Sequence, residues 1–298
     1  MLRAVAFGLA ACLLAAGCGG SSSAQEEPDG PTLQALWRAP GEDVAITPGS
    51  ADFGPGLVRL TFLIIDGRGG VVTRPSARIW IAQGLEERPF AQTTARSEAI
   101  GVEGSDPGEP GAIFVTKLRL RQPGTYWLLA EPVGGRKIQA VGTVVVKKRT
   151  TAPDIGEAAP ASETPTLATA TLEELSTSRE PDPELHRSSI GDAVADGVPF
   201  VVVFATPKYC ASRTCGPVVE VVSTVRRDQA GSGIRFIHAE IYQDNDPAKG
   251  ENRWVKEWKL PSEPWVFVVG ADGNVRDRFE GTVSVRELDA SVRRTLVG

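Results

Sequence analysis

The feature that most constrains this chain is a pair of cysteines between an apolar segment and an amphipathic segment. Residues 200–204 form an uninterrupted apolar run, and Cys210 and Cys215 follow it with four residues between them. The Val-rich residues 218–225 then show the apolar spacing of a helix. This order predicts a buried strand, a loop that carries two thiols, and a helix, which is a setting in which cysteine pairs undergo redox chemistry.

The N-terminus predicts export and determines which thiols are left in the mature protein. Arg3 precedes the apolar residues 4–16, a stretch too short to span a bilayer, and this pattern is typical of a signal peptide. The residues that end at Cys18 resemble the lipobox of bacterial lipoproteins, which implies that Cys18 carries a lipid anchor; the alternative is an ordinary secretory signal. Cys12 leaves with the signal peptide. The pair described above then holds the unmodified thiols, in a compartment that favours disulfides.

The length and charge of the chain limit the number of domains and the kinds of partner that we expect. A chain of 298 residues is long enough for two domains, each with its own core. The balance of 32 Lys and Arg against 37 Asp and Glu, without a basic block, argues against nucleic acid as a partner. His186 and His238 show no ligand spacing around the cysteine pair, so we expect no metal or other cofactor. The predicted organisation is a signal peptide at residues 1–17, a tether at 18–31, an all-β domain at 32–148, a linker at 149–170 and an α/β domain at 171–298.

The pattern of residues 32–148 is typical of an all-β domain, because short alternating segments are separated by Gly and Pro. Phe114, Leu118 and Leu120 share one face of a predicted strand. A Pro-Gly turn then leads into residues 125–130, so we expect these two strands to form a hairpin. Other predicted strands lie at residues 58–65, 77–82 and 138–146.

Roughly seven short strands suit an immunoglobulin-like sandwich. The segment from Pro123 to Tyr126 also resembles Ig-like domains of bacterial envelope proteins. This half of the chain contains no cysteine and no histidine. We therefore expect it to be a spacer or a protein-binding module.

From residue 188 onward, strand and helix patterns alternate, and we expect a central mixed sheet flanked by helices. The expected elements are a helix at residues 189–197, a strand at 199–205, a helix at 218–225, a strand at 234–241, a helix with Trp254 and Trp258, a hairpin at 265–279 and a closing helix that begins with the capping box of Ser284 and Glu287. This order and the cysteine pair resemble the thioredoxin superfamily over residues 188–298. The resemblance implies a thioredoxin-like α/β fold.

The resemblance also implies a set of site residues. Pro264 occupies the position of the family's cis-proline, which lies against the active-site disulfide and beside the backbone that pairs with a substrate peptide. Glu263 and Trp265 flank this proline, and Tyr209 directly precedes the first cysteine. We therefore expect Tyr209, Glu263 and Trp265 to contact the substrate.

The two cysteines are expected to have different roles. Cys210 is the predicted nucleophile and Cys215 the thiol that resolves the mixed disulfide. Unpaired N–H groups at a helix start, together with Lys208 and Arg213, favour the thiolate form. Pro217 leaves an alternative open, because proline is best tolerated in the first turn of a helix. A helix that starts there would place Cys215 nearest its terminus and exchange the roles.

The sequence departs from thioredoxin at three points. Four residues separate the cysteines where thioredoxin has two, and Tyr209 replaces the usual tryptophan. Val203 or Phe204 stands where thioredoxin has a buried carboxylate that assists proton transfer. Acid–base assistance is therefore absent here or comes from another residue.

The favoured function is that of a membrane-anchored, extracytoplasmic thiol-disulfide oxidoreductase that acts on thiols or disulfides of exported proteins, with an electron donor that the sequence does not identify. One alternative is a non-catalytic lipoprotein with a structural disulfide that binds a partner. A thiol peroxidase is a minor alternative, because Pro207 and Pro264 stand where bacterioferritin-comigratory peroxiredoxins carry Thr and Arg. A copper chaperone would need a distant histidine such as His238, which lies in a predicted strand.

Overall fold

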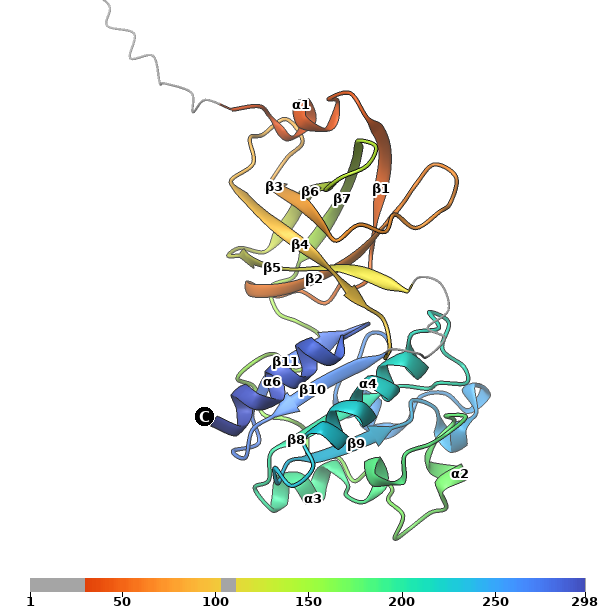
Figure 1. Ribbon diagram of the computed structural model, residues 1–298. Coiled ribbons are helices and arrows are strands. Elements are labelled where there is room, and N and C mark those ends of the chain that lie inside the picture. The colour runs from red at the N-terminus through yellow and green to blue at the C-terminus, as the bar shows by residue number, and fades with distance from the viewer. Residues whose placement is uncertain (1–29, 103–110, 298) are drawn as a thin grey trace, which may run out of the picture. The chain divides into compact units, whose positions relative to one another are not determined.

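The computed structural model of the chain describes residues 30–102 and 111–297. Within these ranges there are two sheets, a closed barrel in the N-terminal half and a four-stranded sheet in the C-terminal half (Figure 1). The chain from Pro31 onward groups into one compact unit. The predicted signal peptide and Cys18 lie outside the described residues, as does nearly all of the tether. None of the helices in the described ranges is both long and apolar enough to cross a membrane.

The barrel follows the strand order β1-β2-β5-β4-β3-β6-β7. Its neighbouring strands are antiparallel, except that β1 and β7 pair in parallel and so close the barrel. A short helix, α1, precedes the first strand. The bounds are α1 (Leu33–Trp37), β1 (Glu42–Pro48), β2 (Gly56–Ile65), β3 (Ser76–Ala82), β4 (Ala91–Ala99), β5 (Ala112–Leu120), β6 (Gly124–Pro132) and β7 (Ile138–Val146).

The predicted immunoglobulin-like sandwich is wrong, because these strands close into one barrel instead of forming two packed sheets. The predicted hairpin is wrong as well. β5 pairs with β2 and β4, whereas β6 pairs with β3 and β7. Since both edges of β5 are occupied, the turn at Pro123 leads the chain to different neighbours. The Tyr126 hydroxyl donates a hydrogen bond to the Gln122 carbonyl over 2.9 Å and ties this turn to β6.

The local strand patterns are confirmed where the alternation was clear. Phe114, Leu118 and Leu120 all point into the barrel core and are buried. The strands predicted at residues 58–65, 77–82 and 138–146 fall within β2, β3 and β7. β1 and β4 were not predicted. β4 is rich in Thr, Ser and charged residues and lacks an apolar alternation.

The second sheet has the strand order β11-β10-β8-β9. β8 and β9 are parallel, and β10 is antiparallel to both β8 and β11, which confirms the predicted hairpin of β10 and β11. The strands are β8 (Phe200–Phe204), β9 (Arg235–Ala239), β10 (Trp265–Val269) and β11 (Val275–Glu280). The helices and 3-10 turns are α2 (Leu172–Leu175), η1 (Pro183–His186), α3 (Ile190–Ala195), α4 (Cys215–Asp228), η2 (Gln243–Asn245), η3 (Pro247–Lys249), α5 (Arg253–Glu257) and α6 (Val285–Val297).

Both faces of this sheet are covered, so every residue of β8 and β10 is buried. Successive side chains of β8 point to opposite faces. Val201 and Val203 pack with the apolar stripes of α4 and α6, whereas Phe200, Val202 and Phe204 pack in the core that also holds residues of α3 and α5. The predicted strand covered on both faces is therefore confirmed at this position.

The predicted fold class is also wrong for this half, because a four-stranded sheet with few helices departs from the typical thioredoxin α/β fold. Only α4 and α6 in the described part are longer than eight residues. Two of the short helices, α3 and α5, are followed by residues with left-handed backbone. α3 is followed by Gly197 with φ of 62°, and α5 by Lys259 with φ of 51°.

Part of the predicted linker packs against the second sheet. Ala152 and Ala159 are buried in its core. The Gly156 N–H donates to the Val275 carbonyl over 2.8 Å, and Ala158 forms an isolated bridge with Asn274. These contacts lie at the start of β11, while the predicted domain boundaries stay a prediction.

Candidate active site

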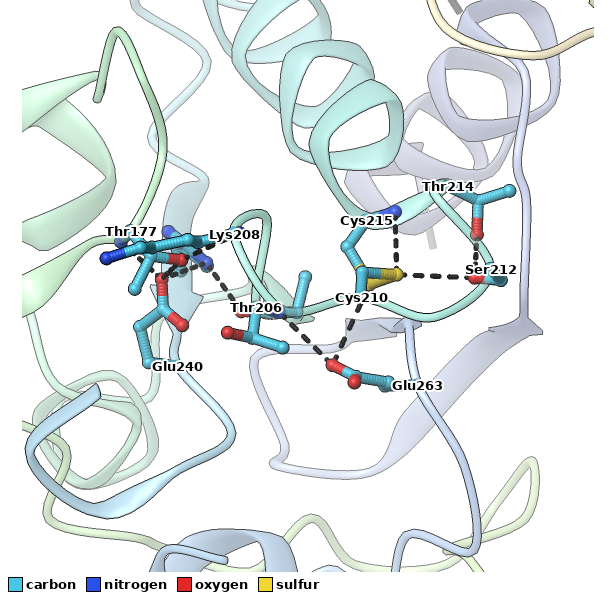
Figure 2. Close-up of a disulfide and its surroundings, with 11 residues drawn as sticks. Thr177, Thr206, Lys208, Cys210, Ser212, Thr214, Cys215, Glu240 and Glu263 are labelled. Carbon is cyan, nitrogen blue, oxygen red and sulfur yellow. Dashed lines mark hydrogen bonds and ion pairs between the residues drawn. A yellow bond between two sulfur atoms is a disulfide. The ribbon is translucent and has the colours of Figure 1, made fainter. Parts of the chain in front are cut away.

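Cys210 and Cys215 form a disulfide where β8 gives way to α4 (Figure 2). Their Cα atoms are 5.9 Å apart. Cys215 is the first residue of α4 and is fully buried, whereas Cys210 lies in the preceding loop and is partly exposed. The two sulfur atoms therefore differ in access to solvent.

Hydrogen-bond donors surround the Cys210 sulfur. The backbone N–H of Cys215 donates to Cys210 Sγ over 3.3 Å, and the Ser212 hydroxyl lies 3.2 Å from the same sulfur. A further hydrogen bond of 2.7 Å joins the hydroxyls of Ser212 and Thr214. A helix-terminal N–H and a hydroxyl both stabilise a thiolate. Ser212 and Thr214 were not predicted as site residues, although they lie within the segment between the cysteines.

Glu263 lies on the other side of the disulfide (Figure 2). Its Oε2 atom is 3.7 Å from Cys215 Sγ and accepts a hydrogen bond from the Thr206 N–H over 3.2 Å. Burial raises the pKa of Glu263 to about 7; the Thr206 N–H opposes this rise, and the charges of Glu240 and Glu251 add to it. The peptide bond between Glu263 and Pro264 is cis, as the resemblance implied.

The remaining predicted site residues lie in different environments. The Tyr209 side chain is 38% exposed, and the Lys208 ammonium lies over its ring at 5.1 Å. Trp265 is fully buried, and its ring stacks on Phe267. Tyr209 is thus exposed next to Cys210 and Glu263 is partly buried next to Cys215, whereas the Trp265 side chain belongs to the core.

A second polar network supports the loop before Cys210. The Glu240 carboxylate accepts hydrogen bonds from the Thr177 N–H over 2.6 Å and the Thr177 hydroxyl over 2.8 Å. The same hydroxyl accepts a hydrogen bond from the Lys208 N–H over 3.2 Å (Figure 2). Sequence reasoning missed this network, because Thr177 and Glu240 lie far from the cysteines along the chain and have no recognisable motif.

The two histidines are buried side by side. The His186 and His238 rings have centroids 5.3 Å apart, and His238 Nε2 lies 3.0 Å from the Ala205 carbonyl oxygen, which accepts its hydrogen bond. Burial, with a smaller contribution from the charge of His238, lowers the pKa of His186 to about 3. His186 is therefore neutral at pH 7 and acts as a core residue.

One set of described residues places three potential metal-binding atoms close together, namely Cys210, Cys215 and Glu263, within 4.8 Å of one another. The two sulfur atoms are joined to each other. A disulfide offers no thiolate, which is the form of cysteine that binds metals. In the oxidised state, Glu263 is therefore the remaining potential metal ligand of this set.

No protein-family model matches the chain, and no curated protein sequence matches it. Among solved structures, it is similar to a thiol:disulfide interchange protein of the thioredoxin family from Chlorobium tepidum, with 18% identity and a TM-score of 0.28 over 34% of this chain and 81% of that one. It is also similar to a chain described as thiol:disulfide interchange protein DsbE from Chlorobium tepidum, with 12% identity and a TM-score of 0.36 over 48% of this chain and 99% of that one. These structural neighbours are thioredoxin-family proteins, and similarity at this level does not assign an activity to this chain.

Proposed function

We propose that this protein is a thiol-disulfide oxidoreductase whose reactive groups are Cys210 and Cys215. The observation that carries the proposal is the asymmetry of the pair. Cys210 is partly exposed and its sulfur accepts the N–H of the first residue of α4, whereas Cys215 is fully buried. An accessible, stabilised thiolate is suited to attack, and a buried neighbouring thiol is suited to resolve the product.

In the reducing direction, the Cys210 thiolate attacks one sulfur of a substrate disulfide. A new S–S bond forms, and the other substrate sulfur leaves as a thiolate. Cys215, once deprotonated, then attacks Cys210 Sγ, closes the Cys210–Cys215 disulfide and releases the second substrate sulfur. Each released thiolate takes up a proton, so the protein dithiol transfers two electrons to the substrate. The reverse steps oxidise a substrate dithiol.

The substrates in this proposal are thiols or disulfides of exported proteins, because the N-terminal pattern of residues 1–18 resembles that of a lipoprotein signal. A lipid on Cys18 would anchor the protein on the outer side of a membrane. The side chains that contact the substrate in this proposal are Tyr209, which is partly exposed beside Cys210, and Glu263, which lies near Cys215. In the reducing direction, turnover also requires a separate donor of electrons that reduces the Cys210–Cys215 disulfide again.

Reduction of insulin in the presence of dithiothreitol tests the proposal. The native protein is expected to accelerate insulin precipitation, and C210S and C215S are both expected to lose this activity. With a substrate disulfide, C215S should accumulate a mixed disulfide through Cys210, because the resolving thiol is gone. Absence of turnover and of any trapped mixed disulfide would contradict the proposal and favour a structural disulfide in a partner-binding protein. Trapping through Cys215 in the C210S variant would show that the roles are exchanged.

A further inference from the structure

The carboxylate of Glu263 is the acidic group in contact with the buried sulfur. Its Oε2 atom lies 3.7 Å from Cys215 Sγ, and Glu263 lies two residues before β10, a strand that pairs with β8. Thr206, two residues after the end of β8, donates its N–H to the same oxygen. The carboxylate is therefore held by the segments that follow β8 and precede β10, and it contacts the first residue of α4.

No positively charged group among the described neighbours that act on Glu263 compensates the negative charge of its ionised carboxylate. The charged neighbours that act on it are the carboxylates of Glu240 and Glu251, and both oppose its ionisation. Burial and the charges of Glu263 and Glu251 raise the pKa of Tyr242, which therefore stays neutral near pH 7. Among the described residues, the Thr206 N–H is the hydrogen-bond donor to this carboxylate, and no ion pair is formed with it. Nothing in this set holds Glu263 permanently ionised.

We propose that Glu263 accepts the proton of the Cys215 thiol when the mixed disulfide is resolved. This inference rests on the proposed oxidoreductase function. After Cys210 has formed the mixed disulfide, the Cys215 proton moves to the Glu263 carboxylate, and the Cys215 thiolate attacks Cys210 Sγ. The S–S bond to the substrate breaks, the substrate sulfur leaves as a thiolate, and the proton on Glu263 passes to that thiolate or to water.

This role fits the chemistry of the site. A general base is most effective when its pKa lies near the working pH, because it is then largely ionised and still basic enough to take a proton. Glu263 meets this condition, since burial raises its pKa to about 7. Val203 and Phe204, by contrast, lie in the apolar interior of the sheet and offer no proton acceptor. Glu263 is thus a catalytic residue of the resolving step.

The two steps can be separated with 5,5′-dithiobis(2-nitrobenzoate), which releases a coloured thiolate at each step. One equivalent of the reagent is mixed with the reduced protein, and the first and second releases report attack by Cys210 and resolution by Cys215. In the native protein, the second rate should fall as the pH drops through about 7, because protonated Glu263 cannot accept a proton. In E263Q, the rate of the second release relative to the first should be at least about tenfold lower at about pH 7 than in the native protein. The decrease of the second rate below about pH 7 should be absent from this variant.

Two control variants make the result specific. E220Q removes the same charge from an exposed position of α4 and should leave both rates and the pH profile of the second unchanged. E263D keeps a carboxylate and should restore a pH-dependent break, which a purely structural role for Glu263 would not require. Near-ultraviolet circular dichroism of each variant checks that it is folded.

The outcomes distinguish this inference from the proposed function. A second release that is equally fast in E263Q, with the same pH profile as the native protein, would overturn the role of Glu263 and leave the oxidoreductase function standing. Absence of the first release from the native protein would overturn the oxidoreductase function itself. A slow second release in E263Q with the native pH break retained would also contradict proton transfer to Glu263.

Discussion

At the scale of single residues, burial determines the charge of His186. Its side chain is almost fully buried, and neither ring nitrogen has a hydrogen-bond partner among the described residues. The imidazolium form would have to be buried without compensation, and this is why the pKa of His186 falls to about 3. His186 is therefore a packing residue that destabilises the folded protein in acid.

The native protein should lose stability as the pH falls below the ordinary histidine pKa of 6.5, because the unfolded chain binds a proton at His186 that the folded protein does not. The contribution is present above that pH and is lost progressively down to a pH of about 3. At about pH 5 the loss amounts to about 1 to 2 kcal/mol of unfolding free energy. H186L should reduce this pH dependence, as measured by urea unfolding at about pH 7.5 and about pH 5. An equal loss in both proteins would show that His186 is not the cause.

At the scale of elements, the sequence predicted individual helices and strands better than it predicted which strands pair. The capping box at Ser284 is confirmed, because the Glu287 N–H donates to the Ser284 hydroxyl over 3.2 Å, and the apolar run of β8 is confirmed as a strand. These features depend on residues close together in the sequence. The pairing partners of β5 and β6 depend on distant residues instead. A turn at Pro123 is compatible both with a hairpin of these two strands and with strands that pair with other neighbours.

The active site shows the same limit. The cysteine pair and the cis-proline could be predicted, because both lie in short recognisable segments. The contact of Glu263 with Cys215 could not, since it joins residues 48 positions apart through the pairing of β8 with β10. Glu263 was predicted to contact substrate on account of its place beside Pro264. In the structure, Glu263 also brings a carboxylate close to the buried Cys215 sulfur, whereas Val203 and Phe204 have apolar side chains.

At the scale of the whole molecule, Asp52 joins the segment between β1 and β2 to β11. Its buried carboxylate accepts hydrogen bonds from the Arg278 guanidinium over 2.7 Å, the Lys147 ammonium over 3.0 Å and the Thr151 N–H over 2.8 Å. Burial alone would raise the pKa of Asp52, but these donors and the Ala152 N–H outweigh it and hold the pKa at about 2. The ionised Asp52 carboxylate therefore binds Lys147, which follows β7, Thr151 of the predicted linker and Arg278 of β11.

This network predicts sensitivity to strong acid. Because the folded pKa of Asp52 lies below its ordinary value of 3.8, the stabilisation is complete above that value and is lost as the pH falls towards about 2. D52N should lower the unfolding free energy near pH 7 by about 2 kcal/mol or more, since Arg278 loses its charged partner. D43N, which removes an exposed carboxylate from β1, is the matched control and should be neutral. Equal urea midpoints for D52N and the native protein would contradict this account.

The reduction potential of the Cys210–Cys215 disulfide tests the central claim most directly. The full protein is equilibrated with dithiothreitol or glutathione buffers of known potential, and free thiols are trapped by alkylation and counted by mass spectrometry. A redox-active pair is expected at a potential less negative than about −300 mV, in the range of catalytic disulfides. A potential more negative than about −300 mV, with the disulfide resistant to reduction in the folded protein, would contradict an oxidoreductase function and identify the bond as structural.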